Sequence, residues 1–517
     1  MMPPSPGEVD TSCESLGSSN GVVKQIDGTE DLERVSSGPA AADLTSKEEP
    51  QEEPADPNVV GWDGDDDPEN PMNWSASSRY GHVLLISAIT MLTSLNASMF
   101  APGVPYLMED FDFTSTELAS FVVSIYILGF GLGPLVLSPL SELYGRLIVY
   151  HISNVLFIIF TVACALSSNL PMLIVFRFLD GCAGSATVTI GGGTISDVIP
   201  QEKRGAAMAI FAVGPLIGPI VGPVAGGFLS QAVDWRWVFW VVSIAAGAVS
   251  ILVLVCMRET YAITLLQRKT IRLRKETGNL SLVSKFHTDL TPGALFKRAI
   301  IRPTKLLLFS PIVLLLSLYG AIVYGYNFLL ISTFTLVFEE QYGFTGGIAG
   351  LTYLGLGIGM MLGMLIFRIL SDKMMMKLSA NGEMKPEYRL PLIIYVTPLV
   401  PIGFFWYGWS AQAHTHWIVP IIGTSFIGMG MLCIFIPIQT YLIDAFPQYA
   451  ASVLAANVVI RCIFGAVLPL AGERMYTTLG LGWGNSLLGF ISIAFSPVPI
   501  LFYRYGEYIR KRYPIDL

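Results

Sequence analysis

Charged side chains are rare in the long apolar segments of this sequence, and two of them lie close together. Arg177 and Asp180 are three residues apart within the apolar segment 172–197, so in a helix they share one face. An ionisable group in an apolar segment of this length is costly and is a functional candidate by default. Asp180 could bind and release a proton beside Arg177. The alternative is a self-neutralising pair whose role is structural.

A second arginine, Arg461, lies in the middle of the apolar segment 450–472, after Asn457. An unpaired arginine is not expected there, because its charge would lose most of its hydration. We therefore expect Arg461 to have a structural role. Its partner would be an acid on another helix or a row of backbone carbonyls.

Glycine recurs at every fourth position of the segment 214–227, next to three prolines. A helix with this spacing has one bare stripe, which allows a neighbouring helix to approach closely. Each proline removes a backbone hydrogen bond and makes the helix easier to bend. The pattern predicts either close packing alone or a bending element that takes part in gating. Its residues are Gly214, Pro215, Gly218, Pro219, Gly222, Pro223, Gly226 and Gly227.

The composition indicates what kind of protein carries these residues. Of the 517 residues, 52% are hydrophobic and 14% are charged, whereas a soluble protein has about 25% charged residues. A soluble enzyme is therefore excluded as the default, and the lack of a basic excess excludes a nucleic-acid binder. The five histidines are scattered and the six cysteines form no metal-binding or disulfide pattern. We expect no catalytic site, no metal and no cofactor.

Twelve apolar segments are long enough to cross a membrane, which takes about 20 residues of helix. A long basic loop at 258–305 separates the sixth segment from the seventh, so the chain divides into halves at 80–257 and 306–505. The segments are 81–101, 118–138, 148–167, 172–197, 206–230, 237–257, 306–330, 348–370, 391–410, 416–442, 450–472 and 485–504.

The regions outside these segments differ in charge. Residues 1–79 hold 18 acidic and 4 basic residues, which predicts a disordered acidic tail, and residues 506–517 form a second, short tail. Lysine and arginine gather in alternate loops, above all in 258–305. The positive-inside rule places these loops and both termini in the cytoplasm. We expect a multi-pass protein of the cell membrane, with the vacuolar membrane as the alternative.

An internal repeat relates the two halves. Three alternate glycines at 129–133, in the second segment, recur at 355–359 in the eighth. Two six-helix halves related in this way are typical of transporters that rock around a site near the membrane midplane.

Several motifs resemble those of one family. The 214–227 pattern resembles the antiporter motif of the major facilitator superfamily, the segment 138–146 its signature loop, and the segment 177–184 its arginine motif. The segments 67–74 and 481–486 are similar to fungal members. Over about residues 67–512 the chain resembles the fungal twelve-span drug:proton antiporters. This implies an all-α integral membrane protein with twelve transmembrane helices in two pseudo-symmetric six-helix halves.

The resemblance also implies a gate. The signature loop would hold one side of the cavity closed through Glu142, Gly145 and Arg146, with Asp372 as the counterpart in the second half. The sequence departs from the family at Leu147, where a second basic residue is usual. It also departs at Asp180, where an amide is common.

In this family the first, fourth, seventh and tenth helices line the cavity. Aromatic rings with a single amide suit a large, partly apolar ligand held by stacking and one hydrogen bond. Besides Arg177 and Asp180, the cavity candidates are Asn96, Tyr324, Tyr326, Asn327, Gln439 and Tyr441.

The expected function is efflux driven by the proton gradient. The protein would be an antiporter that exports small amphipathic molecules, such as a fungal secondary metabolite, a toxin or a xenobiotic drug. Its partners would be the substrate, protons and the lipid bilayer, and it would be a monomer. A polyamine exporter is one alternative, although only Asp180 lies well inside a segment. A nutrient importer is another. Asp197 and Asp444, at helix ends, are expected to be solvated there or to pair with a basic loop, with a role in coupling as the alternative.

Overall fold

The structure, a computed structural model, describes residues 58–64, 66–286, 291–378, 385–446 and 450–512. Within these ranges twelve helical spans are long and apolar enough to cross a membrane, which confirms the predicted number. The spans are Ala76–Asp110, Thr116–Tyr144, Arg146–Ala165, Leu170–Val198, Ile210–Ala232, Arg236–Cys256, Pro311–Tyr342, Gly347–Leu378, Pro386–Gln412, Ile418–Ala445, Ser452–Gly472 and Arg474–Arg512.

The helices form two halves joined by a linker. The N-terminal half contains α1 (Ala76–Ser98), α2 (Val104–Asp110), α3 (Thr116–Leu132), α4 (Pro134–Tyr144), α5 (Arg146–Ala165), α6 (Leu170–Val198), α7 (Gln201–Ala232) and α8 (Arg236–Cys256). The linker contains α9 (Ala262–Thr277) and α10 (Pro292–Phe309). The C-terminal half contains α11 (Pro311–Tyr342), α12 (Gly346–Leu351), α13 (Tyr353–Leu378), α14 (Pro391–Val396), α15 (Leu399–Gln412), α16 (Ile418–Ala445), α17 (Ala450–Phe495) and α18 (Pro497–Arg512).

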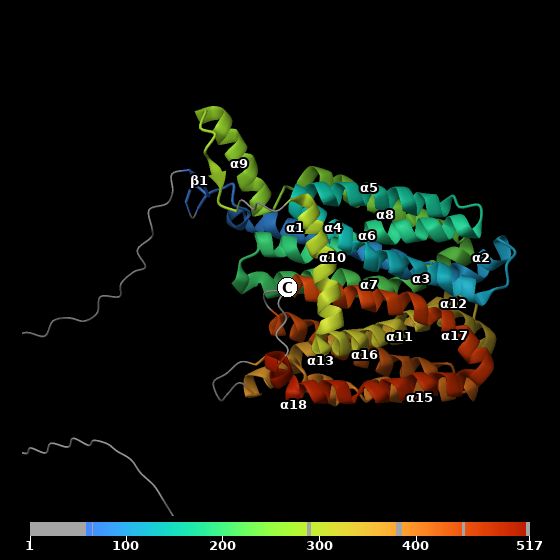
Figure 1. The fold of residues 1–517 in the computed structure, drawn as a ribbon. Coiled ribbons are helices and arrows are strands. Elements are labelled where there is room, and N and C mark those ends of the chain that lie inside the picture. The colour runs from blue at the N-terminus through green and yellow to red at the C-terminus, as the bar shows by residue number, and fades with distance from the viewer. Residues whose placement is uncertain (1–57, 65, 287–290, 379–384, 447–449, 513–517) are drawn as a thin grey trace, which may run out of the picture. The chain divides into compact units, whose positions relative to one another are not determined.

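The two halves lie side by side with their helices roughly parallel (Figure 1). We call the end of the bundle that carries α9 and α10 the linker end, and the end that carries α2 and α12 the opposite end. The linker joins the halves physically, since α10 packs against α4 of one half and against α11 and α17 of the other. The halves also meet through α3 and α17, and through α7 with α12 and α13.

The eleventh and twelfth spans share one long helix, α17. Gly480 interrupts it with φ 76° and ψ 167°, a conformation that only glycine adopts without strain. The chain bends there, so the eleventh span, Ser452–Gly472, lies before the bend, and the twelfth, Arg474–Arg512, contains it.

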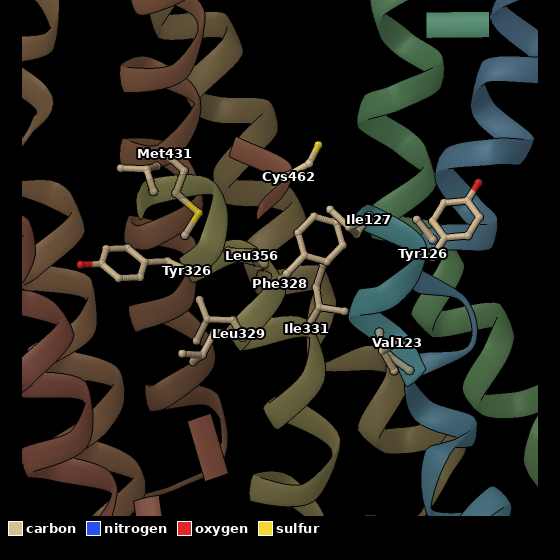
Figure 2. Packing of buried hydrophobic residues seen from close by; sticks show 14 of the residues in the cluster. Val123, Tyr126, Ile127, Tyr326, Phe328, Leu329, Ile331, Leu356, Met431 and Cys462 are labelled. Atoms are coloured by element: carbon tan, nitrogen blue, oxygen red, sulfur yellow. The ribbon is translucent and has the colours of Figure 1, made fainter. Parts of the chain in front are cut away.

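A continuous apolar core connects the halves near the middle of the bundle. Figure 2 shows Ile127 of α3 facing Phe328 of α11, with Cys462 of α17 close by. Cys462 is fully buried and lies against Gly131 of α3, where a side chain in place of the glycine would clash with it. The two halves are therefore in direct contact here.

Part of the predicted disordered tail is folded, so that prediction is wrong for residues 58–64 and 66–79. β1 (Val59–Val60) pairs in parallel with β2 (Val283–Ser284) of the linker, and residues 76–79 begin α1. Residues 1–57 of the predicted tail lie outside the described residues.

A buried ion pair explains the order in this segment. Lys269 of α9 donates to Asp67 at 3.2 Å, and both side chains are 3% exposed. The backbone amide of Asp63 also donates to Asp67 and lowers the pKa of its carboxyl, an effect that burial opposes. The acidic segment cannot form a core of its own. It is ordered here because α9 supplies the opposite charge.

Candidate functional site

Arg177 is held by the backbone of neighbouring helices. It lies on α6, fully buried in the N-terminal half. Its guanidinium donates to the carbonyls of Asn96, Val122 and Val123 at 3.0, 3.3 and 3.4 Å. Its charge is thus satisfied by α1 and α3. Three aromatic rings also lie near it, those of Tyr126, Phe100 and Phe239, with their centroids 4.9, 5.5 and 5.7 Å from Cζ.

Asp180, also fully buried on α6, contacts neutral donors instead of the arginine. The side-chain amide of Asn96 donates to Oδ2 at 2.6 Å, and the hydroxyl of Thr161 donates to Oδ1 at 3.0 Å. Arg177 and Asp180 are both described, and no direct ion pair joins them. The predicted self-neutralising pair is therefore wrong in its direct form. Asn96 connects the two residues. Its backbone carbonyl accepts a hydrogen bond from Arg177, and its side-chain amide donates one to Asp180.

Arg461 has a different environment from the one predicted. It lies on α17 and is 7% exposed. Its Cζ lies 4.6 Å from the ring centroid of Tyr324 and 4.6 Å from that of Phe435. Within the described ranges neither an acid nor a backbone carbonyl accepts a hydrogen bond from it, and its buried Nε has no partner. The expected partner is thus replaced by two aromatic rings.

The six cavity candidates separate into different places. The ring of Tyr324 lies against the guanidinium of Arg461, as described above. Tyr326 points away from the contact between the halves (Figure 2) and donates to the carbonyl of Leu488 at 3.0 Å, so it packs inside the C-terminal half. Tyr441 is buried beside Gly506 of α18. The three candidate tyrosines therefore do not form a single site.

The amide candidates differ as well. Asn96 belongs to the Asp180 site, and its Oδ1 is buried without a partner. Asn327 is 7% exposed, one helical turn from Tyr324 on α11, and its Oδ1 is also unpartnered. Gln439 is half-buried on α16.

The bare glycine stripe of α7 faces α1. A side chain at Gly214 would meet the carbonyl of Ser87, and one at Gly218 would meet the backbone of Leu95. Further along, Gly222 approaches Ser98 and Gly226 approaches Met99 in the same way. The predicted close helix contact is therefore present, within the N-terminal half. A role in gating stays a prediction.

The signature loop lies at the linker end, where Arg146 is the central residue. It forms an ion pair with Asp197 of α6 at 3.4 Å and donates to Ser141 at 2.8 Å. Arg389 and Asp444 form the corresponding pair of the C-terminal half, at 3.1 Å. Both helix-end acids thus pair with basic loop residues, as predicted.

The two acidic gate candidates are Glu142 and Asp372. Glu142 is exposed. Asp372 lies in α13, and its side chain is outside the described residues.

Glu259, which the sequence analysis missed, completes the site. It is 5% exposed and follows α8. Its carboxylate accepts from the backbone amides of Arg146 and Leu147, at 2.9 and 3.2 Å, and so caps α5. Gly145, at φ 98°, packs directly on this carboxylate, which leaves no room for a side chain. Only the fold brings Glu259 to this helix end, since it is 113 positions from Arg146.

Comparison with known sequences identifies the family of this chain. The sequence model of the Major Facilitator Superfamily matches residues 86–469, most of the chain. The chain belongs to this superfamily. The predicted family and fold are confirmed, and the chain is a multi-pass membrane protein with twelve helical spans.

Close relatives in the superfamily are fungal. The MFS-type transporter penM of Penicillium rubens is 57% identical over 461 residues, which cover 89% of this chain and 91% of that protein. The efflux pump radE of Floropilus chiversii is 53% identical over 470 residues, which cover 90% of this chain and 87% of that protein.

Solved structures agree in fold. The partially occluded inward-open form of the xylose transporter XylE from E. coli has a TM-score of 0.63 at 17% identity, covering 83% of this chain and 98% of that chain. At this identity the likeness shows only that the two share the superfamily fold.

Proposed function

We propose that this protein is an antiporter that exports small amphipathic molecules, such as a fungal secondary metabolite, a toxin or a xenobiotic drug, in exchange for protons. Superfamily membership and a relative named as an efflux pump, at 53% identity, support export. In this proposal the proton gradient drives a monomer in the cell membrane, with both termini in the cytoplasm and no cofactor. Asp180 carries the proton.

The hydrogen bonds of Asp180 are the observation that carries the proposal. The hydroxyl of Thr161 has a single hydrogen but two acceptors within reach, Asp180 at 3.0 Å and the carbonyl of Phe157 at 2.7 Å. When Asp180 is charged, Thr161 donates to it. When Asp180 is protonated, Asp180 donates to Thr161 and Thr161 donates to Phe157. Both protonation states are therefore satisfied without breaking an ion pair.

Protonation of Asp180 can reach the contact between the halves through α1. The carboxylate holds Asn96 of α1 by a 2.6 Å hydrogen bond, which is stronger when the acceptor is charged. α1 packs closely along the glycine stripe of α7. The other side of α7 contacts the C-terminal half, where Ile220 lies against Gly357 and Pro223 against Gly350. A proton at Asp180 thus loosens the first link of a chain that leads to the partner half.

A charge-neutral substitution tests this role. In everted vesicles with an imposed pH gradient, we expect Asp180→Asn to abolish gradient-driven uptake of a fluorescent amphipathic dye that the wild type transports. Exchange of dye across vesicles without a gradient should persist, because the amide keeps the shape of the site. Rates are normalised to the amount of protein.

Two matched variants serve as controls. Asp180→Glu keeps a carboxyl group and should retain part of the gradient-driven transport. Glu109→Gln removes an exposed carboxyl at the end of α2 and should leave dye uptake coupled to the gradient. Full gradient-driven transport by Asp180→Asn at normal protein amounts would show that another group carries the proton. A loss of folded protein without uncoupling would instead assign Asp180 a structural role.

A further inference from the structure

We propose that Arg461 is a substrate-binding residue, which pairs with a carboxylate or an equivalent delocalised oxyanion on a planar, conjugated substrate. The proposal names the substrate class of the exporter proposed above and rests on that function. It starts from the environment of the guanidinium, which is the least satisfied charge in the middle of the described spans.

Burial makes an unpaired arginine expensive. Arg461 is 7% exposed and lies at the centre of the span Ser452–Gly472, far from both ends of the bundle. An intramembrane charge normally pairs with another side chain or with backbone carbonyls. Among the residues that the structure describes, Arg461 has one side-chain contact of this kind, with the thiol of Cys462, and its Nε is buried without an acceptor. Neither a carboxylate nor a backbone carbonyl accepts a hydrogen bond from it. A thiol is a weak acceptor, so most of the hydrogen-bonding capacity of the guanidinium is left for a molecule that is not part of the chain.

Two aromatic rings hold the guanidinium in place. Tyr324 of α11 and Phe435 of α16 stack on each other, with centroids 6.3 Å apart and an angle of 23° between their planes. The Cζ of Arg461 lies 4.6 Å from each centroid. Cation–π contacts of this kind stabilise the charge without using its N–H groups. A guanidinium fixed in this way presents parallel donors, which match the two oxygens of a carboxylate.

The surroundings suit a flat conjugated body. The stacked rings of Tyr324 and Phe435 offer an aromatic surface beside the charge. One helical turn along α11, the buried Oδ1 of Asn327 lacks a donor, so it can accept a hydrogen bond from a hydroxyl or amide of the ligand. The combination of one cation, two rings and one amide acceptor fits a phenol- or enol-bearing acid better than a polyamine, which Arg461 would repel.

The position of Arg461 links binding to transport. The next residue, Cys462, lies against Gly131 of α3, so this part of α17 touches the N-terminal half. Likewise Gly465, one turn further, lies between Tyr324 and Ile127 of α3. An anion bound at Arg461 would therefore sit where the two halves move against each other.

The test compares three probes that share one ring system. Purified protein in lipid nanodiscs is titrated with 9-anthracenecarboxylate, anthracene-9-carboxamide and 9-anthracenemethylamine, and binding is followed by anthracene fluorescence against empty nanodiscs. We expect the wild type to bind the carboxylate about tenfold more tightly than the amide, and the amine least well. Arg461→Met should remove this preference, while Arg461→Lys, which keeps the charge but not the planar fork, should retain part of it.

Controls separate binding from folding. Arg368→Met removes an exposed arginine of α13 and should bind all three probes like the wild type. The gel-filtration profile and thermal midpoint of Arg461→Met should match those of the wild type. A wild type without preference for the carboxylate, or an Arg461→Met variant that keeps the preference, would overturn the proposal.

The test can fail independently of the export function. If gradient-driven dye export is intact but the carboxylate preference is absent, only the inference about Arg461 is wrong. If the preference depends on Arg461 but no probe is exported, the binding site stands and the proposed export does not.

Discussion

Among the described residues, each half of the bundle carries one arginine in its interior, and the surroundings of the two arginines differ. Arg177 and Arg461 both lie close to aromatic rings. Arg177 also donates to three backbone carbonyls and is connected through Asn96 to Asp180. Arg461 has no such acceptor within the described residues, and its Nε is unpartnered. The charge of Arg177 is hydrogen-bonded within its own half, whereas the charge of Arg461 lacks a carbonyl or carboxylate acceptor among the described residues.

This difference lies in the middle of the molecule. At the linker end the halves repeat each other, since Arg146 pairs with Asp197 of α6 and Arg389 pairs with Asp444 of α16. Our two proposals assign these unlike centres different functions, a proton site in the N-terminal half and an anion site in the C-terminal half. Three pairs of variants test that division, from the largest expected effect to the smallest.

Replacing the two arginines gives the largest contrast. Arg177→Met removes three hydrogen bonds from a charged group, each worth about 1.5–3 kcal/mol, and leaves Asp180 without a nearby cation. We expect its free energy of unfolding to fall by at least about 3 kcal/mol. Arg461→Met loses no hydrogen bond to a carbonyl or carboxylate, and the lost ring contacts are offset because a costly buried charge is removed as well, so we expect a change of about 1 kcal/mol or less. Thermal unfolding in detergent measures both. Equal losses would erase the distinction between the two sites.

Replacing the two amides gives an intermediate contrast. The side chain of Asn96 donates to buried Asp180, so Asn96→Leu leaves that carboxylate short of a donor, at a cost of about 1–3 kcal/mol. The Oδ1 of Asn327 has no partner to lose, so Asn327→Leu should change the stability by about 0.5 kcal/mol or less. Unfolding of both variants is compared under identical conditions. A greater cost at Asn327 would reveal that its amide stabilises the fold after all.

Replacing single hydroxyls gives the smallest contrast. Tyr126 donates to the carbonyl of Thr93 at 2.9 Å, so Tyr126→Phe should cost about 1 kcal/mol. Tyr324 contributes its ring to the Arg461 site, so Tyr324→Phe should leave both stability and carboxylate binding unchanged. Tyr324→Leu, which removes the ring, should weaken carboxylate binding in the nanodisc assay. Weakened binding by Tyr324→Phe would mean that the hydroxyl contacts the ligand.

The local pattern of the sequence predicts most of the fold. Twelve spans and the linker follow from length and hydropathy, because a helix across a bilayer must satisfy its backbone internally and present apolar side chains to lipid. The glycine spacing of α7 likewise predicts a close helix contact, since the period of the helix places Gly214 to Gly226 on one side. These properties depend on residues near one another in the chain, so the sequence by itself determined them.

Pairing over long sequence distances could not be predicted in this way. Arg177 and Asp180 share a face, but their partners are Asn96 on α1 and Thr161 on α5. Tyr324 and Tyr326 are two residues apart, and helix geometry turns the first toward Arg461 and the second toward Leu488. Spacing alone shows which residues share a helix face, and leaves open which helix that face meets.

The two clearest errors have the same cause. The acidic segment around Asp67 has the composition of a disordered tail, and it is ordered by Lys269, 202 positions away. Glu259 follows a span without any motif, and it caps α5 because the ends of α8 and α5 meet at the linker end. In both cases the role of the charged residue depends on the group that it contacts, which is a lysine for Asp67 and a helix end for Glu259. The sequence determined which residues are charged and which segments span the membrane, and only the packing of the helices decided which charges are satisfied within the protein.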